Sequence, residues 1–428
     1  MRDNRMRISL REVIYVLAAL VLFFEIYLME QINIIRYMDE FAAVVCLLII
    51  LVQAFKKRLD RSQIGMLLLM LLLLGIGLVS NYYSNLQENP VAIITDVGNP
   101  FKVFVTYVGA TLYLRPVKNK KWIVTSLARV MRLYVLVMFV GLFLHLTGVY
   151  PMGNDVRYGI ASYEFLNFGA GQLSFMFYTV FTVLTIDMRY DRHNRQIKMM
   201  FIILAAIVWA STLRLRALMY VAMFFAFYWL IIVKERRIKM NWKTALVVIV
   251  VMLVFSVDQL GVYFGNTGAA RYVFMKRGIQ TMRTYFPFGA GFSCYGADAA
   301  VKYYAKLYVH FGFQRVWGLS PQYPLFAHDT YWPAIMAQFG AFGLVVMLLI
   351  VYRWVRDLLK RTQYNKYAYL VGLFVVLTQV SASIATATFF HFVTLALCFV
   401  LPIAFEDNTT KQEIGVSCDE SNRLYPNV

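Results

Sequence analysis

Apolar residues occur in long runs along the chain, separated by short polar connections that hold most of the charge. Each run is close to the roughly 20 mainly apolar residues that an α-helix needs to cross the hydrocarbon core of a bilayer. The pattern therefore predicts an all-α polytopic membrane protein. About twelve transmembrane helices are expected, at residues 13–29, 38–55, 63–80, 98–114, 127–147, 166–186, 198–212, 215–233, 244–257, 333–352, 367–384 and 388–405.

One polar interval is much longer than the others and divides the chain. A connection of this length is usually functional, so we expect it to carry catalytic and substrate-binding residues. The predicted organisation is an N-terminal bundle of about nine spans (1–257), a large extracytoplasmic loop (258–332), about three C-terminal spans (333–405) and a cytoplasmic tail (406–428).

The distribution of charge gives the orientation of these spans. The net charge is +19, and alternate connections, counted from the N-terminus, hold 30 of the 42 Lys and Arg residues. Of the remaining 12, seven lie in the long loop, so the short connections on that side are nearly free of basic residues. Cytoplasmic connections are the ones enriched in Lys and Arg, which predicts an inner-membrane protein with both termini in the cytoplasm. The basic residues are thus explained by topology, and no nucleic-acid partner is expected.

Two arginines, Arg214 and Arg216, lie in the short outer turn of the segment STLRLRAL. Basic residues are rare in such turns, and ionisable groups near the membrane usually face a cavity or a partner because their burial in lipid is costly. One interpretation is that both side chains simply extend to the membrane interface. The other is an anion site, because a guanidinium stays charged and presents a forked set of donors to phosphate oxygens.

The long loop contains the segment RYVFMKRGIQTMRTYFPFGAGF, which predicts a basic helix followed by a glycine turn. Gly289 and Gly291 would permit a sharp turn or a close approach of the backbone to a ligand. A lone Gly-x-Gly does not indicate a nucleotide-binding fold, because the strand–turn–helix context is missing. The basic residues have spacings compatible with one side of a helix: Arg271, Lys276, Arg277 and Arg283.

The loop ends in AHDTYWPAIMAQFGAFG, where the chain is expected to re-enter the membrane. His328 titrates near neutral pH and can accept a proton from a sugar hydroxyl, with Asp329 orienting it. The alternative is an interfacial histidine beside Asp329 as a helix cap. His310, in an aromatic stretch, and His391, within an apolar run, are weaker candidates.

The order of these three segments resembles the O-antigen polymerase and O-antigen ligase superfamily, bacterial inner-membrane enzymes that assemble surface polysaccharides. STLRLRAL is comparable with the family's Ser-Arg motif, and the loop segments are similar to its Pro-x-Gly-x-Gly turn and its His-Asn-x-Tyr segment before a Gly-x-x-Gly span. The resemblance covers the second half of the chain. It departs from the family at Asp329, where the family has asparagine, and at the Ser-Arg motif, whose counterpart is either Arg214 or Arg216.

The resemblance implies a fold like that of the GT-C-like glycosyltransferases and the activity of a polysaccharide polymerase for O-antigen, capsule or exopolysaccharide. The enzyme would transfer a growing glycan from undecaprenyl diphosphate to a lipid-linked repeat unit, with inversion, on the outer face of the inner membrane. The expected catalytic residues are Arg271 and His328, the expected diphosphate-binding residues are Arg214, Arg216, Arg271 and Arg277, and the supporting residues are Asp329, Gly289, Gly291 and Tyr331.

No metal or other cofactor is expected. Arginine can neutralise a departing diphosphate, and the sequence has no carboxylate cluster with metal-ligand spacing. The expected partners are an undecaprenyl-diphosphate-linked oligosaccharide, the lipid bilayer and a chain-length regulator protein.

Two other functions remain open. A ligase would use the same chemistry but transfer finished glycan to lipid A-core. A flippase or transporter for lipid-linked sugars would need charged groups deep in several spans to line its path. In the sequence such groups are few, chiefly Glu25 and Lys102.

Overall fold

The computed structural model describes residues 8–153, 155–166, 169–190, 194–236, 261, 268–327 and 329–405. The described chain is helical apart from loops and one short antiparallel hairpin of strands β1 (Val156–Arg157) and β2 (Ile160–Ala161). The predicted span at 244–257, the predicted tail at 406–428 and His328 lie outside the described residues.

The helices follow one another with short connections. In the first half of the chain they are α1 (Leu10–Leu28), η1 (Asn33–Tyr37), α2 (Met38–Phe55), α3 (Arg61–Ser84), α4 (Pro90–Val97), α5 (Lys102–Leu114), α6 (Lys120–Leu146), α7 (Ala170–Asp187), α8 (Arg195–Ala210), α9 (Leu215–Tyr228) and η2 (Trp229–Val233). In the second half they are α12 (Ala270–Thr284), α13 (Asp298–Lys302), α14 (Lys306–His310), η3 (Phe313–Arg315), α15 (Tyr331–Thr362), α16 (Lys366–Ala385), η4 (Thr388–Phe390), α17 (Phe392–Val400) and η5 (Leu401–Ala404).

The helices coincide with the apolar runs, and α2 begins and ends at the predicted residues 38 and 55. Six helical segments of the described chain are long and apolar enough to cross a membrane, or seven if α4 and α5 form one span bent by 44°. The protein is therefore an all-α membrane protein, whereas the full count of twelve spans stays a prediction. The six segments are Asn33–Phe55, Arg61–Ser84, Lys120–Leu146, Leu215–Val233, Tyr331–Thr362 and Lys366–Ala385.

The outer faces of α2 and α3 are apolar. Leu48 and Leu51 on α2, and Leu68 and Leu71 on α3, are exposed to the surroundings of the protein. Large contiguous apolar surfaces are rare on soluble monomers and mark contact with a membrane or a partner. These faces are suited to lipid.

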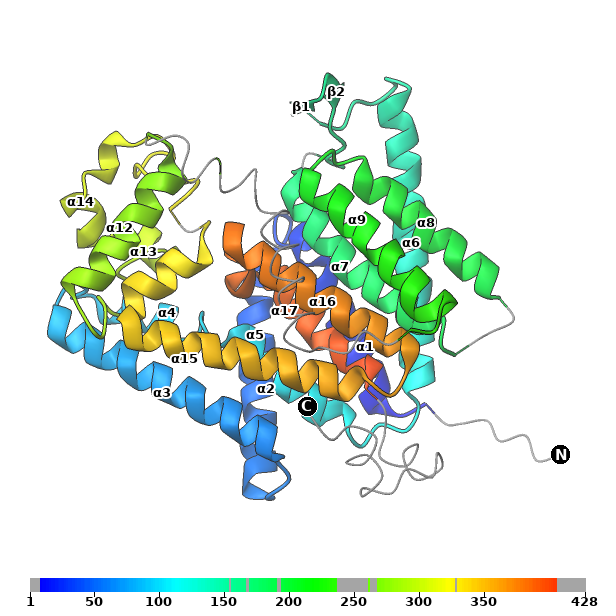
Figure 1. The fold of residues 1–428 in the computed structure, drawn as a ribbon, viewed down its shortest axis with the longest axis horizontal. Helices are drawn as coiled ribbons and strands as arrows, with labels where there is room; N and C mark the ends of the chain where they lie inside the picture. Colours follow the sequence, from blue (N-terminus) through cyan, green and yellow to red (C-terminus); the bar gives the residue numbers. More distant parts are fainter. Residues whose placement is uncertain are drawn as a thin grey trace.

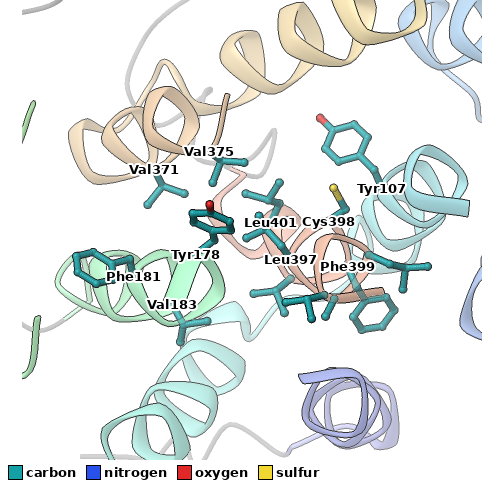
Figure 2. Close-up of a cluster of buried hydrophobic side chains, with 14 of the residues drawn as sticks. Tyr107, Tyr178, Phe181, Val183, Val371, Val375, Leu397, Cys398, Phe399 and Leu401 are labelled. Atoms are coloured by element: carbon teal, nitrogen blue, oxygen red, sulfur yellow. The ribbon is translucent and has the colours of Figure 1, made fainter. Parts of the chain in front are cut away.

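The centre of the bundle is formed around α17, which is short and fully enclosed. Figure 2 shows Leu397, Cys398 and Phe399 of α17 packed between Tyr107 of α5 and side chains of α7 and α16. The predicted span at 388–405 is thus a broken helix, η4–α17–η5, whose side chains are buried against α1, α5 and α7.

Residues 268–327, which were predicted to form the outer loop, fold into a small helical layer. Helices α12, α13 and α14 surround a separate apolar cluster that includes Phe274, Tyr295 and Tyr308. This layer lies at one end of the long helices α3 and α15, as Figure 1 shows. Its extracytoplasmic location stays a prediction.

The layer is joined to α15 at a break in that helix. Gly340 has φ 64° and ψ −160°, so the helix is interrupted there. The turn at residues 287–291 docks into the break: the N–H groups of Ala290 and Gly291 donate to the carbonyls of Ala337 and Gln338, each at 2.8 Å. The backbone groups released by the break are in this way partly satisfied by the preceding turn.

Candidate functional site

A cavity of about 700 Å³ lies where one set of helix ends meets. Its walls come from the end of α1, the starts of α2, α5, α7 and α9, the α16–α17 connection and the layer of α12 and α13. Five basic and five acidic side chains line it, an unusual density for a chain in which 15% of residues are charged. They are Glu25, Arg36, Asp39, Glu40, Lys102, Arg214, Arg216, Arg271, Asp298 and Asp329.

The tight turn between α8 and α9 delivers Arg214 and Arg216 to the cavity. Leu213 adopts a left-handed conformation with φ 51°, which reverses the chain so that Arg214 is the N-cap of α9. The first turn of a helix presents unpaired N–H groups and the positive end of the helix dipole. Both arginines and this helix end therefore favour an anion.

The two arginines have different surroundings. Arg214 faces the β-hairpin, with Asp155 at 3.7 Å, and its buried Nε has no hydrogen-bond partner among the described residues. Burial and the neighbouring charge of Arg157 lower the pKa of Arg214, despite the attraction of Asp155 and Glu164. Since a guanidinium does not lose its proton in proteins, this means that its charge is incompletely compensated.

Arg216 lies instead toward the interior of the bundle, within electrostatic range of the hydroxyls of Tyr178 and Tyr220. The described chain places no carboxylate in ion-pair contact with it. Tyr220 exchanges a hydrogen bond of 2.7 Å with Ser381 of α16, which holds this wall of the cavity in place. Arg216 is thus a cation within electrostatic range of two tyrosine hydroxyls and of Arg214.

Arg271, at the start of α12, forms an ion pair with Asp329, 58 residues later. Its Nε donates to Asp329 Oδ2 at 3.0 Å and its Nη2 donates to the same oxygen. The guanidinium also lies 5.1 Å from the centre of the Phe326 ring. The alternative in which Asp329 caps a helix is wrong, because the N-cap residue of α15 is Thr330 and the carboxylate of Asp329 is paired with Arg271. The predicted orientation of His328 by Asp329 stays a prediction.

A second ion pair lies on the opposite wall, near the start of α2 and α5. Lys102 Nζ donates to Asp39 Oδ2 at 2.6 Å, and both side chains are almost completely buried. Glu25 of α1 is within electrostatic range of this pair and of Glu40. In the structure the apolar run that contains Lys102 is divided between two helices, because α4 ends at Val97 and α5 starts at Lys102.

His391 also lines the cavity, at the N-terminus of α17. Its Nδ1 accepts a hydrogen bond of 3.3 Å from the N–H of Val393, and its ring stacks between Phe175 and Phe392. A neutral imidazole that accepts at Nδ1 carries its proton on Nε2, so this ring is a hydrogen-bond donor there. The tautomer is inferred from this hydrogen bond.

Of the residues predicted for the site, the structure brings together Arg214, Arg216, Arg271 and Asp329 around the cavity. Glu25, Lys102 and His391, which the sequence also pointed out, line it too. Arg277 does not line the cavity in the described structure, because it lies on another side of α12, where it donates to Gln280 and covers the ring of Phe311. His328, for which a catalytic role is predicted, lies outside the described residues.

The remaining predicted residues stabilise the packing of the elements that carry the site. Gly289 and Gly291 have φ 86° and 95°, and each approaches backbone closely, that of Gly340 for Gly289 and that of Asn81 for Gly291. Tyr331 is buried against the rings of Phe389 and Phe390. These residues hold the layer and α15 together.

Sequence reasoning missed several lining residues, chiefly Arg36, Asp39 and Asp298, and named His391 only as a weaker candidate. His391 was undervalued because it lies in an apolar run. An ionisable residue in such a run is itself a signal, because it is usually tolerated only where it faces a cavity or a partner. Among the described residues there is no group of three or more His, Cys, Asp and Glu side chains that could hold a metal ion.

Comparison of the chain with protein-family models and with curated proteins finds no match.

Proposed function

We propose that this protein is a membrane-embedded glycosyltransferase that polymerises a polysaccharide, such as O-antigen, capsule or exopolysaccharide. Its donor would be a growing glycan on undecaprenyl diphosphate, and its acceptor a lipid-linked repeat unit. The observation that supports this proposal best is the convergence of Arg214, Arg216 and Arg271 on one cavity at the helix ends. A lipid substrate can reach such a cavity from the surrounding bilayer.

The chemistry of the reaction matches the charges. Transfer breaks the bond between the anomeric carbon and the diphosphate, so negative charge develops on the leaving group. Preorganised cations that act where charge develops in the transition state are the strongest single contribution to many enzymatic rates. Arg214 and Arg216 are suited to this role because their charge is not fully matched by carboxylates in the described chain. Arg271 is aligned by Asp329, which limits its freedom to reorient.

The aromatic and hydroxyl groups of the cavity suit the sugar. Tyr178, Tyr220 and Phe175 form a wall next to the arginines. Aromatic faces provide rigid apolar area, while their hydroxyls and His391 supply hydrogen-bond donors and acceptors. His328 remains the group predicted from the sequence to take the proton of the acceptor hydroxyl.

Two alternatives use the same cavity. A ligase differs only in its acceptor, lipid A-core, and nothing in the cavity distinguishes that acceptor from a repeat unit. A flippase for lipid-linked sugars is favoured by one observation, the buried charges Glu25, Asp39 and Lys102 on three helices, because buried charges in membrane proteins often line a transport path.

The test is glycan extension by the purified protein in lipid nanodiscs supplied with lipid-linked repeat units, followed on a gel. A polymerase yields a ladder of products, whereas a ligase transfers preformed polymer to lipid A-core and a flippase makes no new bond. Arg216→Ala should slow extension by about 10²- to 10³-fold, the range seen when one charge-stabilising donor is removed.

Arg277→Ala is the matched control, since Arg277 is on α12 with Arg271 but outside the lining of the cavity. Extension should be unchanged in this variant. Wild-type protein that makes no glycosidic bond with any supplied acceptor would refute the proposal.

A further inference from the structure

Glu25 has a position that the proposed charge stabilisation does not explain. It lies near the C-terminal end of α1, its residue surface is 1% exposed, and it lines the cavity. Its Oε2 is buried and has no hydrogen-bond partner among the described residues. A buried carboxyl oxygen without a partner is costly, and such atoms in native proteins usually have a functional explanation.

The neighbouring cation does not neutralise Glu25. Lys102 is the closest basic group in electrostatic range, but its ammonium donates to Asp39 at 2.6 Å. Asp39 and Glu40, in the first turn of α2, repel a second negative charge at Glu25. The free Oε2 therefore faces the cavity as an acceptor for a hydroxyl group that enters it, which is the geometry required of a proton acceptor.

The other groups of the cavity are less suited to this task. The carboxylates of Asp39 and Asp329 are held in ion pairs with Lys102 and Arg271. His391 uses its Nδ1 lone pair for the N–H of Val393 and carries its proton on Nε2. Of the two buried acidic groups that the structure describes in this cavity, Asp39 has a partner for each oxygen, whereas Oε2 of Glu25 has none.

We propose that Glu25 is the catalytic base that accepts the proton of the acceptor sugar's hydroxyl. This inference rests on the proposed glycosyltransferase function. In the step, the hydroxyl oxygen forms a bond to the anomeric carbon of the donor as its proton moves to Glu25. The bond from that carbon to the diphosphate oxygen breaks, and the lipid diphosphate leaves with the electron pair, neutralised by the arginines. Glu25 later returns the proton to water.

The test separates binding from chemistry in the full-length protein. Glu25→Gln keeps the size of the side chain but cannot accept the proton. We expect the rate of glycan extension to fall by about 10²- to 10⁴-fold, the usual contribution of a general base. Binding of undecaprenyl diphosphate, used as the probe and measured directly in nanodiscs, should remain within about twofold of wild type, since the arginines are untouched.

Glu12→Gln is the matched control. Glu12 is a buried glutamate on the same helix, but it caps the backbone N–H of Ser9 at the other end of α1 and does not line the cavity. Glu12→Gln should leave the rate of glycan extension unchanged. If Glu25→Gln does not fold, Glu25→Asp keeps the carboxylate and should retain an intermediate rate with unchanged binding of the probe.

The outcomes are distinct. Undiminished extension by folded Glu25→Gln refutes the inference but leaves the proposed function intact. If His328→Ala is then the variant that loses extension, the base is His328. Loss of probe binding together with extension in Glu25→Gln also overturns the inference, because it shows a role in binding. If the wild type forms no glycosidic bond, the proposed function fails first, and the inference falls with it.

Discussion

The docking of the 287–291 turn into α15 depends on glycine at position 289. Gly289 has φ 86°, a left-handed conformation that disfavours any residue with a Cβ. A Cβ placed there would lie 2.7 Å from the carbonyl oxygen of Gln338 and 2.8 Å from that of Ala337, and closer still to the amide nitrogen of Gly340. All three are backbone atoms, so none can rotate away.

The cost of Gly289→Ala can be worked out from these contacts. The left-handed conformation costs an alanine about 1–2 kcal/mol. Relief of the collision requires the turn to move away from α15, which sacrifices the hydrogen bonds of Ala290 and Gly291 and a third, of 3.2 Å, from Phe342 to Pro287. At about 1 kcal/mol each, these add about 3 kcal/mol. The expected total is about 4–5 kcal/mol of unfolding free energy.

Two control glycines separate strain from collision. Gly312→Ala introduces only the strain, because Gly312 has φ 68° with nothing within 4 Å of the new Cβ. Gly98→Ala introduces neither. The readout is the melting temperature in detergent, followed by tryptophan fluorescence. It should be unchanged for Gly98→Ala and should fall for Gly312→Ala by the equivalent of about 1–2 kcal/mol of unfolding free energy. The fall should be several times larger for Gly289→Ala.

The extension assay adds a second measurement. The turn fixes α12 against the start of α15; Arg271 lies on α12, and Asp329 lies two residues before α15. Gly289→Ala should therefore slow glycan extension more than Gly312→Ala does. Equal melting temperatures for Gly289→Ala and Gly312→Ala would refute the reasoning, since the contact with α15 would then contribute nothing.

Three further predictions concern charges and a thiol. Burial raises the pKa of the Asp60 carboxyl, but the guanidinium of Arg361 outweighs it and holds the pKa below its ordinary value. The pair thus stabilises the fold at neutral pH, and this stabilisation is lost as the pH falls through the lowered pKa of Asp60. The melting temperatures of wild type and Asp60→Asn should therefore differ at pH 7 and converge in acid. Lys102→Met leaves the buried Asp39 unpaired and should cost about 3–5 kcal/mol, most of which the double variant with Asp39→Asn should recover in the same unfolding experiment. Burial raises the pKa of the Cys294 thiol to about 12, so a polar maleimide at pH 7 should modify the peptide that contains it only after denaturation in SDS, as read by mass spectrometry.

The sequence predicted the positions of the helices well because length and hydrophobicity determine which segments suit a bilayer. The match at 38–55 is of this kind, since the apolar run from Phe41 to Val52 forms the body of α2. Lys102 was harder to interpret. It weakened the predicted span, and only the fold shows that it pairs with Asp39, a residue 63 positions earlier.

The candidate site was predictable in part. Arg214 and Arg216 stood out because basic residues in a short outer turn oppose the usual distribution of charge. The pairing of Arg271 with Asp329 and the presence of His391 in the same cavity depend on which helix ends meet, and no local pattern contains that information. The glycine turn was predicted either to turn the chain sharply or to approach a ligand, and the structure shows a turn at Gly289 and Gly291 that packs closely against other backbone, including that of α15.

The break in α15 has a consequence for biosynthesis. A helix interrupted at Gly340 releases backbone groups that hydrocarbon cannot satisfy, at a cost of several kcal/mol for each unpaired group. The turn that pairs with them lies about 50 residues earlier in the chain, so it leaves the ribosome first. The order of synthesis therefore supplies the partner before the interrupted helix needs it, and α15 can enter the membrane against a surface that already exists.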